Sequence, residues 1–476
     1  MKILYCTSEA NPFAGSGGLA DVAGSLPKIL RQRGVDCRVV MPLYGDIPQY
    51  LKDGMNFITS FAVPVAWRMQ YCGVFWAQYD GVIFYFIDSD YYFKRDGLYG
   101  FYDDAERFAF FSRAILEMLP HIDFHPDLIH TNDWQTALVP TYYYCFYSEN
   151  RWYQNIKSLF TIHNIQYQGM YGWDVNTECV GLPEKCKPIL EHDGKLNMMK
   201  AGIETSTRVS TVSPSYANEI LDPWFSHNLD PILKGVSYKL CGILNGIDND
   251  CYNPATDFQL YANYTPEYPE GKGHCKYMLQ KRLGLETRWD IPMIAMVTRL
   301  VSHKGVDLVR DGIEDILNRN DVQFVVLGSG DEEYEEYFRS LHNRYPGRVC
   351  FCPGYVPELA RKIYSASDIF LMPSKSEPCG LSQMIALRYG SIPVVREVGG
   401  LRDSIKDSMD GYGNGFTFKL YDTQDMTYAL QRAIDGYWNR DGWKTLRYRA
   451  MTSDNSWNRS ADSYIGLYRD TIDNWK

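Results

Sequence analysis

The sequence lacks both a regular cysteine pattern and a long apolar run. Its 12 cysteines are scattered over 476 residues without a C-x-x-C pair, which favours free thiols in a reducing compartment over a zinc site or disulfide framework. No stretch approaches the roughly 20 apolar residues of a membrane-spanning helix. The first residues, MKILYCTSEANPF, have too short an apolar run for a secretory signal peptide. We therefore expect a cytoplasmic protein without a membrane partner.

The sequence also lacks an excess of basic residues. Lys and Arg total 48 against 58 Asp and Glu, so the net charge is -10, and such a surface repels the phosphates of nucleic acid. No acidic D-x-D pair stands out in a metal-binding context. What is present is an ordinary globular composition, 45% hydrophobic and 22% charged. At roughly 100–200 residues per domain, the length predicts two or more domains.

Apolar periodicity predicts α/β structure in both halves. Residues 3–7 and 35–41 are short apolar runs, and between them a glycine turn precedes apolar residues at helical spacing. This βαβ unit implies a parallel sheet. The second half repeats the pattern, with a helix at 305–318 and strands at 292–297, 322–327, 369–372 and 392–395.

The chain is therefore predicted to hold two doubly wound α/β halves. The crossover between them is expected near 241–248, followed by an irregular connector at 253–275 that is rich in Pro, Gly, Tyr and Asn. Open parallel sheets bind ligands at the carboxyl ends of their strands. Polar residues that directly follow the strands are thus the candidates for a site.

Two segments could bind a diphosphate. Gly15, Gly17 and Gly18 precede a helix, where backbone N–H groups and the helix dipole attract anions, although a plain tight turn has the same pattern. Arg299 and Lys304 share the loop after the strand at 292–297, and two cations there would neutralise a leaving diphosphate. A pair of solvated surface cations is the alternative.

Three further side chains could bind a sugar. Glu377 lies in a turn between a buried strand and a helix, with a second glycine turn at 399–401, and the alternative is a helix-capping carboxylate. His163 follows a strand and could instead be a satisfied structural histidine. Asp133 and Trp134 follow another strand and could clamp a sugar, or they could be a helix cap and a buried ring.

Together these segments resemble the bacterial glycogen synthase and plant starch synthase family over nearly the whole chain. Each motif alone is weak, but their order and spacing are specific. The matching motifs are GGLADV at 17–22, NDW at 132–134, TIHN at 161–164, LNGID at 244–248, RL at 299–300, KG at 304–305, PS at 373–374, EPCGL at 377–381 and GGL at 399–401, with a closing segment at 454–468.

The resemblance implies a GT-B fold, in which two Rossmann-like domains enclose the active site in the cleft between them. The N-terminal, acceptor-side domain would span 1–242, with a final helix at 455–476 crossing back onto it. The C-terminal, nucleotide-sugar-binding domain would span 243–454. The implied activity is a retaining transfer of glucose from ADP-glucose to the non-reducing end of an α-1,4-glucan, without a metal or other cofactor. The implied partners are thus a nucleotide sugar and an α-glucan chain.

The resemblance also implies residue roles on the donor side. Arg299 and Lys304 would hold the leaving diphosphate, and Gly18 would donate a backbone N–H to it from the loop that includes Gly15 and Gly17. Leaving-group stabilisation would dominate catalysis, because negative charge develops on the diphosphate.

On the sugar side, Glu377 would bind glucose hydroxyls and orient the donor. His163 and Asp133 would contact the transferred glucose, and the acceptor 4-hydroxyl would attack from the front side. The other substrate-binding residues would be Asn245 near the hinge, Tyr355 against the base, and Cys379, Gly380, Leu381 and Ser382 in the turn after Glu377.

One position departs from the family pattern. The family usually has Lys-x-Gly-Gly, where the lysine contacts the nucleotide sugar, and Gly15 stands at that position here. A charge-assisted hydrogen bond is worth roughly 1.5–3 kcal/mol, so donor affinity and the choice between ADP-glucose and UDP-glucose stay open.

Other interpretations also stay open, because the motifs give more information about the donor site than about the identity of the acceptor. One is a related GT-B transferase with another acceptor, and another is a divergent, non-catalytic glucan-binding paralogue. Arg299 and Lys304 argue against a pure binder, which has no need for diphosphate cations. A glycogen phosphorylase would need a pyridoxal-phosphate lysine, which no segment marks. The oligomeric state does not follow from the sequence.

Overall fold

The computed structural model describes residues 1–475, which divide into two compact units. Unit 1 comprises Met1–Asn245 together with the C-terminal segment that begins at Trp457, and unit 2 comprises Gly246–Ser456. The chain therefore leaves unit 1 after Asn245 and returns to it at Trp457.

Within the described residues, unit 1 is built on a nine-stranded sheet. Its strands, in spatial order, are β12 (Leu240–Gly242), β11 (Arg208–Thr211), β7 (Lys157–Ile162), β6 (Leu128–Asn132), β1 (Lys2–Cys6), β2 (Asp36–Pro42), β5 (Val82–Asp88), β4 (Arg68–Tyr79) and β3 (Asn56–Val65). The strands from β12 to β5 run parallel, whereas β4 and β3 join as an antiparallel hairpin that the sequence analysis did not predict. A small antiparallel sheet combines β8 (Met170–Tyr171), β10 (Lys195–Asn197) and β9 (Glu191–His192).

Helices cover both faces of the large sheet of unit 1. Helix α1 (Gly18–Gln32) connects β1 to β2, and α5 (Leu138–Tyr142) lies between β6 and β7 in the chain. These two connections run in opposite directions across the sheet. Right-handed crossovers therefore place α1 and α5 on opposite faces. Helices α4 (Asp104–Met118) and α7 (Met198–Thr205) pack with α5.

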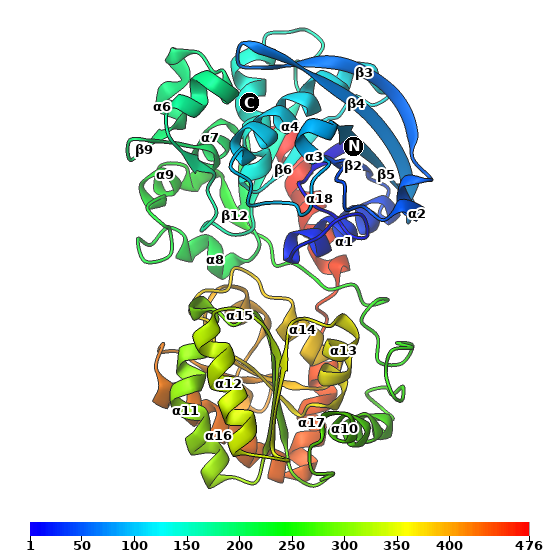
Figure 1. Cartoon of the computed structure of the whole chain (residues 1–476), viewed down its shortest axis with the longest axis vertical. Coiled ribbons are helices and arrows are strands. Elements are labelled where there is room, and N and C mark those ends of the chain that lie inside the picture. Colours follow the sequence, from blue (N-terminus) through cyan, green and yellow to red (C-terminus); the bar gives the residue numbers. More distant parts are fainter. Residues whose placement is uncertain (476) are drawn as a thin grey trace. The chain divides into compact units, whose positions relative to one another are not determined.

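The final helix, α18 (Trp457–Asn474), packs into unit 1 beside α1, and Figure 1 shows it in red among the blue and cyan elements. Its inward side chains include Tyr464 and Tyr468, both fully buried. The Tyr468 hydroxyl lies 2.8 Å from Nδ1 of the buried His130 in β6. The last helix in the sequence is therefore part of the core that the first strands form.

Unit 2 is a six-stranded parallel sheet between two helical layers, as Figure 1 shows. Helices α11 (Val306–Arg319), α12 (Glu332–Arg344) and α16 (Thr423–Trp438) cover one face. Helices α10 (Glu270–Leu283), α13 (Pro357–Ala366), α14 (Ser382–Arg388) and α17 (Arg440–Thr452) lie on the other. The strands are, in spatial order, β15 (Val349–Pro353), β14 (Gln323–Gly328), β13 (Met293–Val297), β16 (Ile369–Met372), β17 (Ile392–Arg396) and β18 (Phe416–Phe418).

The prediction of an irregular connector at 253–275 was wrong at its end, because α10 begins at Glu270. The buried face of this helix carries Lys272, Lys276 and Gln280 where an amphipathic helix normally has apolar residues. The hydrophobic period that would have marked this helix in the sequence is therefore absent.

We expect Tyr468→Ala to destabilise unit 1 by about 3–5 kcal/mol, because it leaves a large cavity between α18 and β6. Arg469→Ala, at an exposed position of the same helix, is the matched control and should change stability by less than about 0.5 kcal/mol. Denaturant unfolding followed by circular dichroism measures both variants. Equal stabilities would show that α18 does not stabilise unit 1.

Candidate active site

The candidates of unit 1 follow adjacent parallel strands. Asp133 comes just after β6, His163 after β7 and Asn245 after β12, and Glu9, which was not among the predicted residues, follows β1. Strands β1, β6 and β7 are consecutive in the sheet, and β11 lies between β7 and β12. Because parallel strands end at the same edge, the four side chains lie along the carboxyl edge of the unit 1 sheet.

Asp133 and His163 are linked directly. Asp133 Oδ1 accepts hydrogen bonds from the backbone N–H groups of His163, at 2.7 Å, and Asn164, at 3.3 Å. Asp133 also has φ 56° and ψ 179°, a conformation that is almost restricted to glycine. Its carboxylate does not cap the short helix that follows, so the helix-cap alternative is wrong. Strained residues of this kind cluster at functional sites.

The protonation states at this edge follow from burial. The pKa of Asp133 is raised to about 7, mainly by burial and to a lesser extent by the nearby Glu9 carboxylate, and the two backbone N–H groups oppose the shift. Burial lowers the pKa of His163 to about 3, so its imidazole is neutral near pH 7. The amide of Asn132 donates from Nδ2 to the Cys6 carbonyl, which leaves Asn132 Oδ1 to accept from His163 Nε2–H at 2.9 Å. His163 thus acts as a fixed, neutral group.

The sequence analysis missed Glu9. Its Oε2 accepts hydrogen bonds from the backbone N–H of Ser16, at 2.5 Å, and from Ser16 Oγ, at 2.8 Å. Burial raises the pKa of Glu9, although the bonds from Ser16 lower it. The carboxylate thereby fixes the loop between β1 and α1. Its position just after a buried strand was the only signal in the sequence.

The three glycines of this loop differ in their surroundings. Gly17 has extended backbone and Gly18 begins α1, and a Cβ atom on either would meet no atom within 4 Å. A Cβ atom on Gly15 would instead lie 2.6 Å from Ala20 Cβ and 2.8 Å from Asn11 Oδ1. The loop therefore has no room for the lysine that the family usually has at position 15.

The candidates of unit 2 also lie at the carboxyl edge of their sheet. Arg299 and Lys304 follow β13, Tyr355 follows β15, and Glu377 follows β16. Strands β13 and β16 are neighbours at the centre of the sheet, so their loops are adjacent. The sequence analysis had no direct signal for this adjacency, because the two loops are more than 70 residues apart in the chain.

Lys304 and Glu377 form an ion pair, with 2.7 Å between Lys304 Nζ and Glu377 Oε2. The same oxygen accepts a hydrogen bond from Ser374 Oγ at 2.9 Å. Glu377 is buried, and the N-cap position of α14 belongs to Leu381, so the helix-capping alternative for Glu377 is wrong. The alternative that Lys304 is a solvated surface cation is also wrong, because its side chain is largely buried and paired with Glu377. Arg299 is exposed, and its guanidinium has no hydrogen bond or ion pair within residues 1–475.

Two glycines let these loops approach each other. A Cβ atom on Gly305, which has φ 73°, would lie 2.1 Å from the carbonyl oxygen of Pro373. A Cβ atom on Gly399, which has φ 45°, would lie 2.0 Å from the carbonyl oxygen of Glu377. Both positions require glycine, because the φ values and the contacts exclude larger residues. The backbone around Glu377 is thus fixed from both sides.

The other predicted substrate-binding residues lie at the same two edges. Asn245 is buried, and its Oδ1 has no hydrogen-bond partner among the described residues, a condition that usually costs about 1–3 kcal/mol. Tyr355 exposes 68% of its surface. The turn after Glu377 consists of the buried Cys379, Gly380 at φ 71°, Leu381 and then Ser382, the first residue of α14.

No group of three or more His, Cys, Asp or Glu side chains in the described part of the chain is arranged to hold a metal ion. Likewise, no helix within residues 1–475 has the length and apolar character to cross a membrane.

Family models and relatives agree with this geometry. The model of the starch synthase catalytic domain matches residues 2–235, and the model of glycosyl transferases group 1 matches residues 285–446. The glycogen synthase of Desulforamulus reducens is 49% identical over 478 residues, covering 100% of this chain and 99% of that protein. The glycogen synthase of Clostridium perfringens is 48% identical, covering 99% of this chain and 98% of that protein. The chain belongs to the glycogen synthase and starch synthase family.

Solved structures support the same assignment for this synthase. The catalytic domain of starch synthase IV from Arabidopsis thaliana, bound to ADP and acarbose, matches with a TM-score of 0.91 at 35% identity and covers 99% of each chain. Sucrose-phosphate synthase from Thermosynechococcus elongatus shares the fold, with a TM-score of 0.61, 19% identity and 98% coverage of each chain. The predicted family, the GT-B fold and the enzyme class are confirmed, and the activity of the synthase is glucosyl transfer in glycogen or starch synthesis.

We expect Gly15→Ala to destabilise the synthase by about 1–3 kcal/mol, because the new methyl group overlaps Ala20 and Asn11. Gly17→Ala is the matched control. Its extended backbone and open surroundings should limit the change to less than about 0.5 kcal/mol. Thermal unfolding separates the two variants, and equal melting temperatures would contradict the packing described for Gly15.

We expect Asp133→Asn to change how stability depends on pH. The folded-state pKa of Asp133 is raised to about 7, so the folded protein holds a proton that the unfolded chain releases near pH 4. This contribution is fully present below about pH 4 and is lost as the pH rises through about 7. The unfolding free energy of the wild type, relative to the variant, should therefore fall across this range. A pH-independent difference in urea unfolding would show that Asp133 titrates normally.

Proposed function

We propose that the synthase transfers glucose from ADP-glucose to the non-reducing end of an α-1,4-glucan, with retention of the anomeric configuration. The observation that supports this most strongly is the Lys304–Glu377 pair, a cation and a carboxylate held together at the carboxyl edge of unit 2. The Arabidopsis relative, which this chain matches over 99% of its length, was solved with ADP and acarbose. We therefore assign the nucleotide sugar and the glucan chain as its two partners.

Arg299 and Lys304 supply positive charge to the leaving diphosphate in this proposal. Lys304 is fixed by Glu377, whereas the exposed Arg299 guanidinium offers its planar donors to phosphate oxygens. The backbone N–H of Gly18, at the positive end of α1, adds a third donor. Donors aimed at developing charge lower the barrier more than donors that bind the ground state. No metal ion is required for this step.

Glu377 binds and orients the glucose of the donor. Lys304 and Ser374 both bind Oε2, so they fix the orientation of the carboxylate toward sugar hydroxyls. The turn formed by Cys379, Gly380, Leu381 and Ser382 lines the donor site beside it. The exposed ring of Tyr355 stacks on the base.

On the acceptor side, Asp133 and His163 contact the transferred glucose. Asp133 accepts backbone hydrogen bonds through Oδ1, and His163 is neutral and oriented by Asn132. The buried, unpaired Oδ1 of Asn245 is a further acceptor for a hydroxyl group. The 4-hydroxyl of the glucan forms the new bond to the anomeric carbon on the face from which ADP departs. Its proton passes to the departing diphosphate oxygen, so the charges balance.

The direct test is glucose transfer to glycogen with ADP-glucose and UDP-glucose in parallel, with EDTA present. We expect transfer from ADP-glucose at a rate that EDTA does not lower, in a reducing, cytoplasm-like buffer. A preference for UDP-glucose would reassign the donor and keep the reaction. Transfer from neither donor would contradict the proposal.

We expect Lys304→Ala and Glu377→Ala each to lower kcat by at least about 10²-fold, as the loss of one preorganised electrostatic group does in other enzymes. Lys419→Ala, which removes an exposed cation of the same unit, is the control and should retain wild-type kcat. Circular dichroism checks that each variant is folded. Near-normal turnover in either active-site variant would remove that residue from the mechanism.

A further inference from the structure

The amino edge of the unit 2 sheet holds a cavity of about 180 Å³, which we call the amino-edge cavity. Its charged lining consists of Lys272 and Lys276 from α10, Asp368, and Arg440, Lys444 and Arg447 from α17. Asp368 directly precedes β16, and its Oδ2 accepts the N–H of Met293, the first residue of β13, at 2.9 Å. The cavity therefore lies at the end of the sheet opposite Lys304 and Glu377.

The amino-edge cavity is distinct from the diphosphate site. Strand β13, which separates the two edges, has five residues. At roughly 3.3 Å per residue, it puts them about 16 Å apart. One small molecule cannot bind at both.

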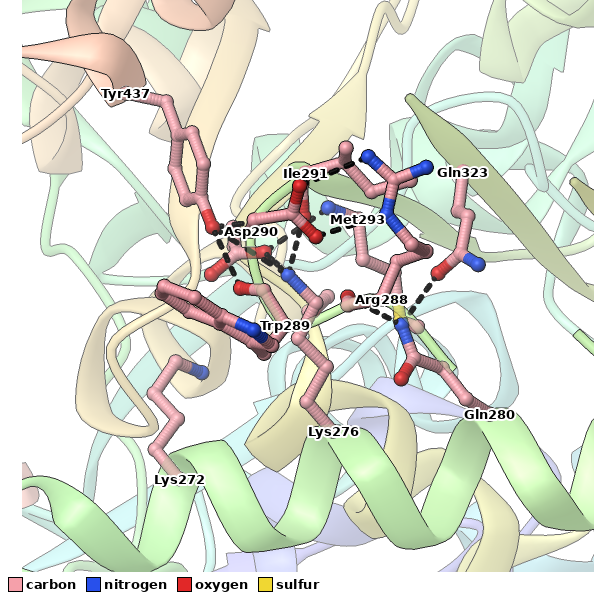
Figure 2. Close-up of polar contacts among 12 residues, drawn as sticks. Lys272, Lys276, Gln280, Arg288, Trp289, Asp290, Ile291, Met293, Gln323 and Tyr437 are labelled. Carbon is pink, nitrogen blue, oxygen red and sulfur yellow. Dashed lines mark hydrogen bonds and ion pairs between the residues drawn. The ribbon is translucent and has the colours of Figure 1, made fainter. Parts of the chain in front are cut away.

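The two lysines of α10 are held by the protein. Lys276 Nζ pairs with Asp368 at 2.7 Å and also donates to the Ile291 carbonyl. Lys272 Nζ donates to the carbonyls of Ser365 and Tyr389, each at 3.0 Å, and has no carboxylate partner among the described residues. Figure 2 shows both lysines projecting from the same side of α10, with Lys272 below the ring of Trp289.

The three cations of α17 are not balanced by buried carboxylates. Arg440 donates to the Asp290 carbonyl at 2.7 Å, and Lys444 lies 3.8 Å from Asp441, which is almost fully exposed. Arg447 forms no hydrogen bond or ion pair within the part of the chain that the structure describes. The spacing of 440, 444 and 447 puts the three on one face of the helix.

Five cations therefore line the cavity against one carboxylate, Asp368, in a chain whose net charge is -10. The neighbouring cations also contribute to the pKa of the buried Lys272. Burial is the main cause that lowers the pKa of Lys272 to about 7, Asp368 opposes the shift, and Arg447 and Lys276 contribute to it. A bound anion would offset the excess positive charge.

The volume of the cavity and the aromatic side chains that line it indicate which kind of anion it can hold. A water molecule occupies roughly 30 Å³ in the liquid, so about 180 Å³ holds a phosphate group with room to spare. The aromatic lining includes Trp443, Tyr437 and Trp289, and Trp289 exposes 81% of its surface. Such rings can cover the carbon skeleton of an ester.

We propose that the amino-edge cavity binds a phosphate group, free or as the ester of a small molecule, through Arg447, Lys444 and Arg440. The inference does not depend on the donor or acceptor proposed above. It adds a second anion site to unit 2, built on the face of α10 that carries lysines where the core would otherwise be apolar.

The test is isothermal titration of the whole chain with inorganic phosphate and, separately, with a hexose monophosphate. We expect saturable binding that weakens at least tenfold in the double variant Lys444→Gln with Arg447→Gln, neither of which removes a buried ion pair. Lys281→Gln, an exposed cation on α10 outside the cavity, is the matched control and should bind as the wild type does. Tighter binding of the hexose monophosphate would identify an ester as the ligand, and equal affinities would identify phosphate itself.

Lys304→Ala separates this site from the diphosphate site. Binding should persist in Lys304→Ala, whatever that variant does to turnover. Binding that is lost in Lys304→Ala but kept in the double variant would place the anion at the carboxyl edge and overturn the proposal. The absence of saturable binding of either probe at millimolar concentration would overturn it as well.

Discussion

The ion pair between Lys304 and Glu377 is the interaction on which the site of unit 2 depends. It joins the loops that follow the two central strands, β13 and β16, and it holds both charges in a largely buried place. Removing one partner of such a pair leaves an uncompensated buried charge, which strongly destabilises the folded protein. Gly305 and Gly399 permit the close approach of the surrounding backbone. The loops are therefore organised before any substrate arrives.

Unit 1 also fixes a buried carboxylate at the carboxyl edge of its sheet, but with different partners. Its site residues also follow parallel strands, but the central group is a carboxylate held by backbone N–H groups and not by a cation. Burial, with a smaller contribution from Glu9, raises the pKa of Asp133, and its backbone conformation is strained. Strain and burial of this kind persist only when the surrounding fold stabilises them. Helix α18 contributes to that stability through the contact of Tyr468 with His130 in β6, the strand that Asp133 directly follows.

The sequence predicted what local patterns determine. Buried parallel strands appear as short apolar runs, so β13, β14, β16 and β17 were placed within a residue or two of their bounds. Parallel strands end at a common edge, so polar residues after them, such as Asp133 and Glu377, were identified as candidates. The family motifs then assigned their roles.

What the sequence could not predict depends on contacts between distant residues. Whether Glu377 caps a helix or pairs with Lys304 was decided by the adjacency of β13 and β16. Glu9 was not predicted because its role depends on the hydrogen bond that it accepts from Ser16. The tight packing of Gly15 against Ala20 and Asn11 has no local signal in the sequence either. Helix α10 was missed because Lys272 and Lys276 occupy its buried face, where tertiary partners replace hydrophobic packing.

The most direct test of the account is a double-mutant cycle on kcat/KM for ADP-glucose, using Lys304→Ala, Glu377→Ala and the double variant. If the two residues act as one preorganised unit, the double variant loses little more than the worse single variant. The coupling energy should then exceed about 2 kcal/mol, in the upper part of the roughly 0.5–3 kcal/mol range of residues in one charged network. Additive losses, with a coupling below about 0.5 kcal/mol, would show that Lys304 and Glu377 act independently and would contradict the account.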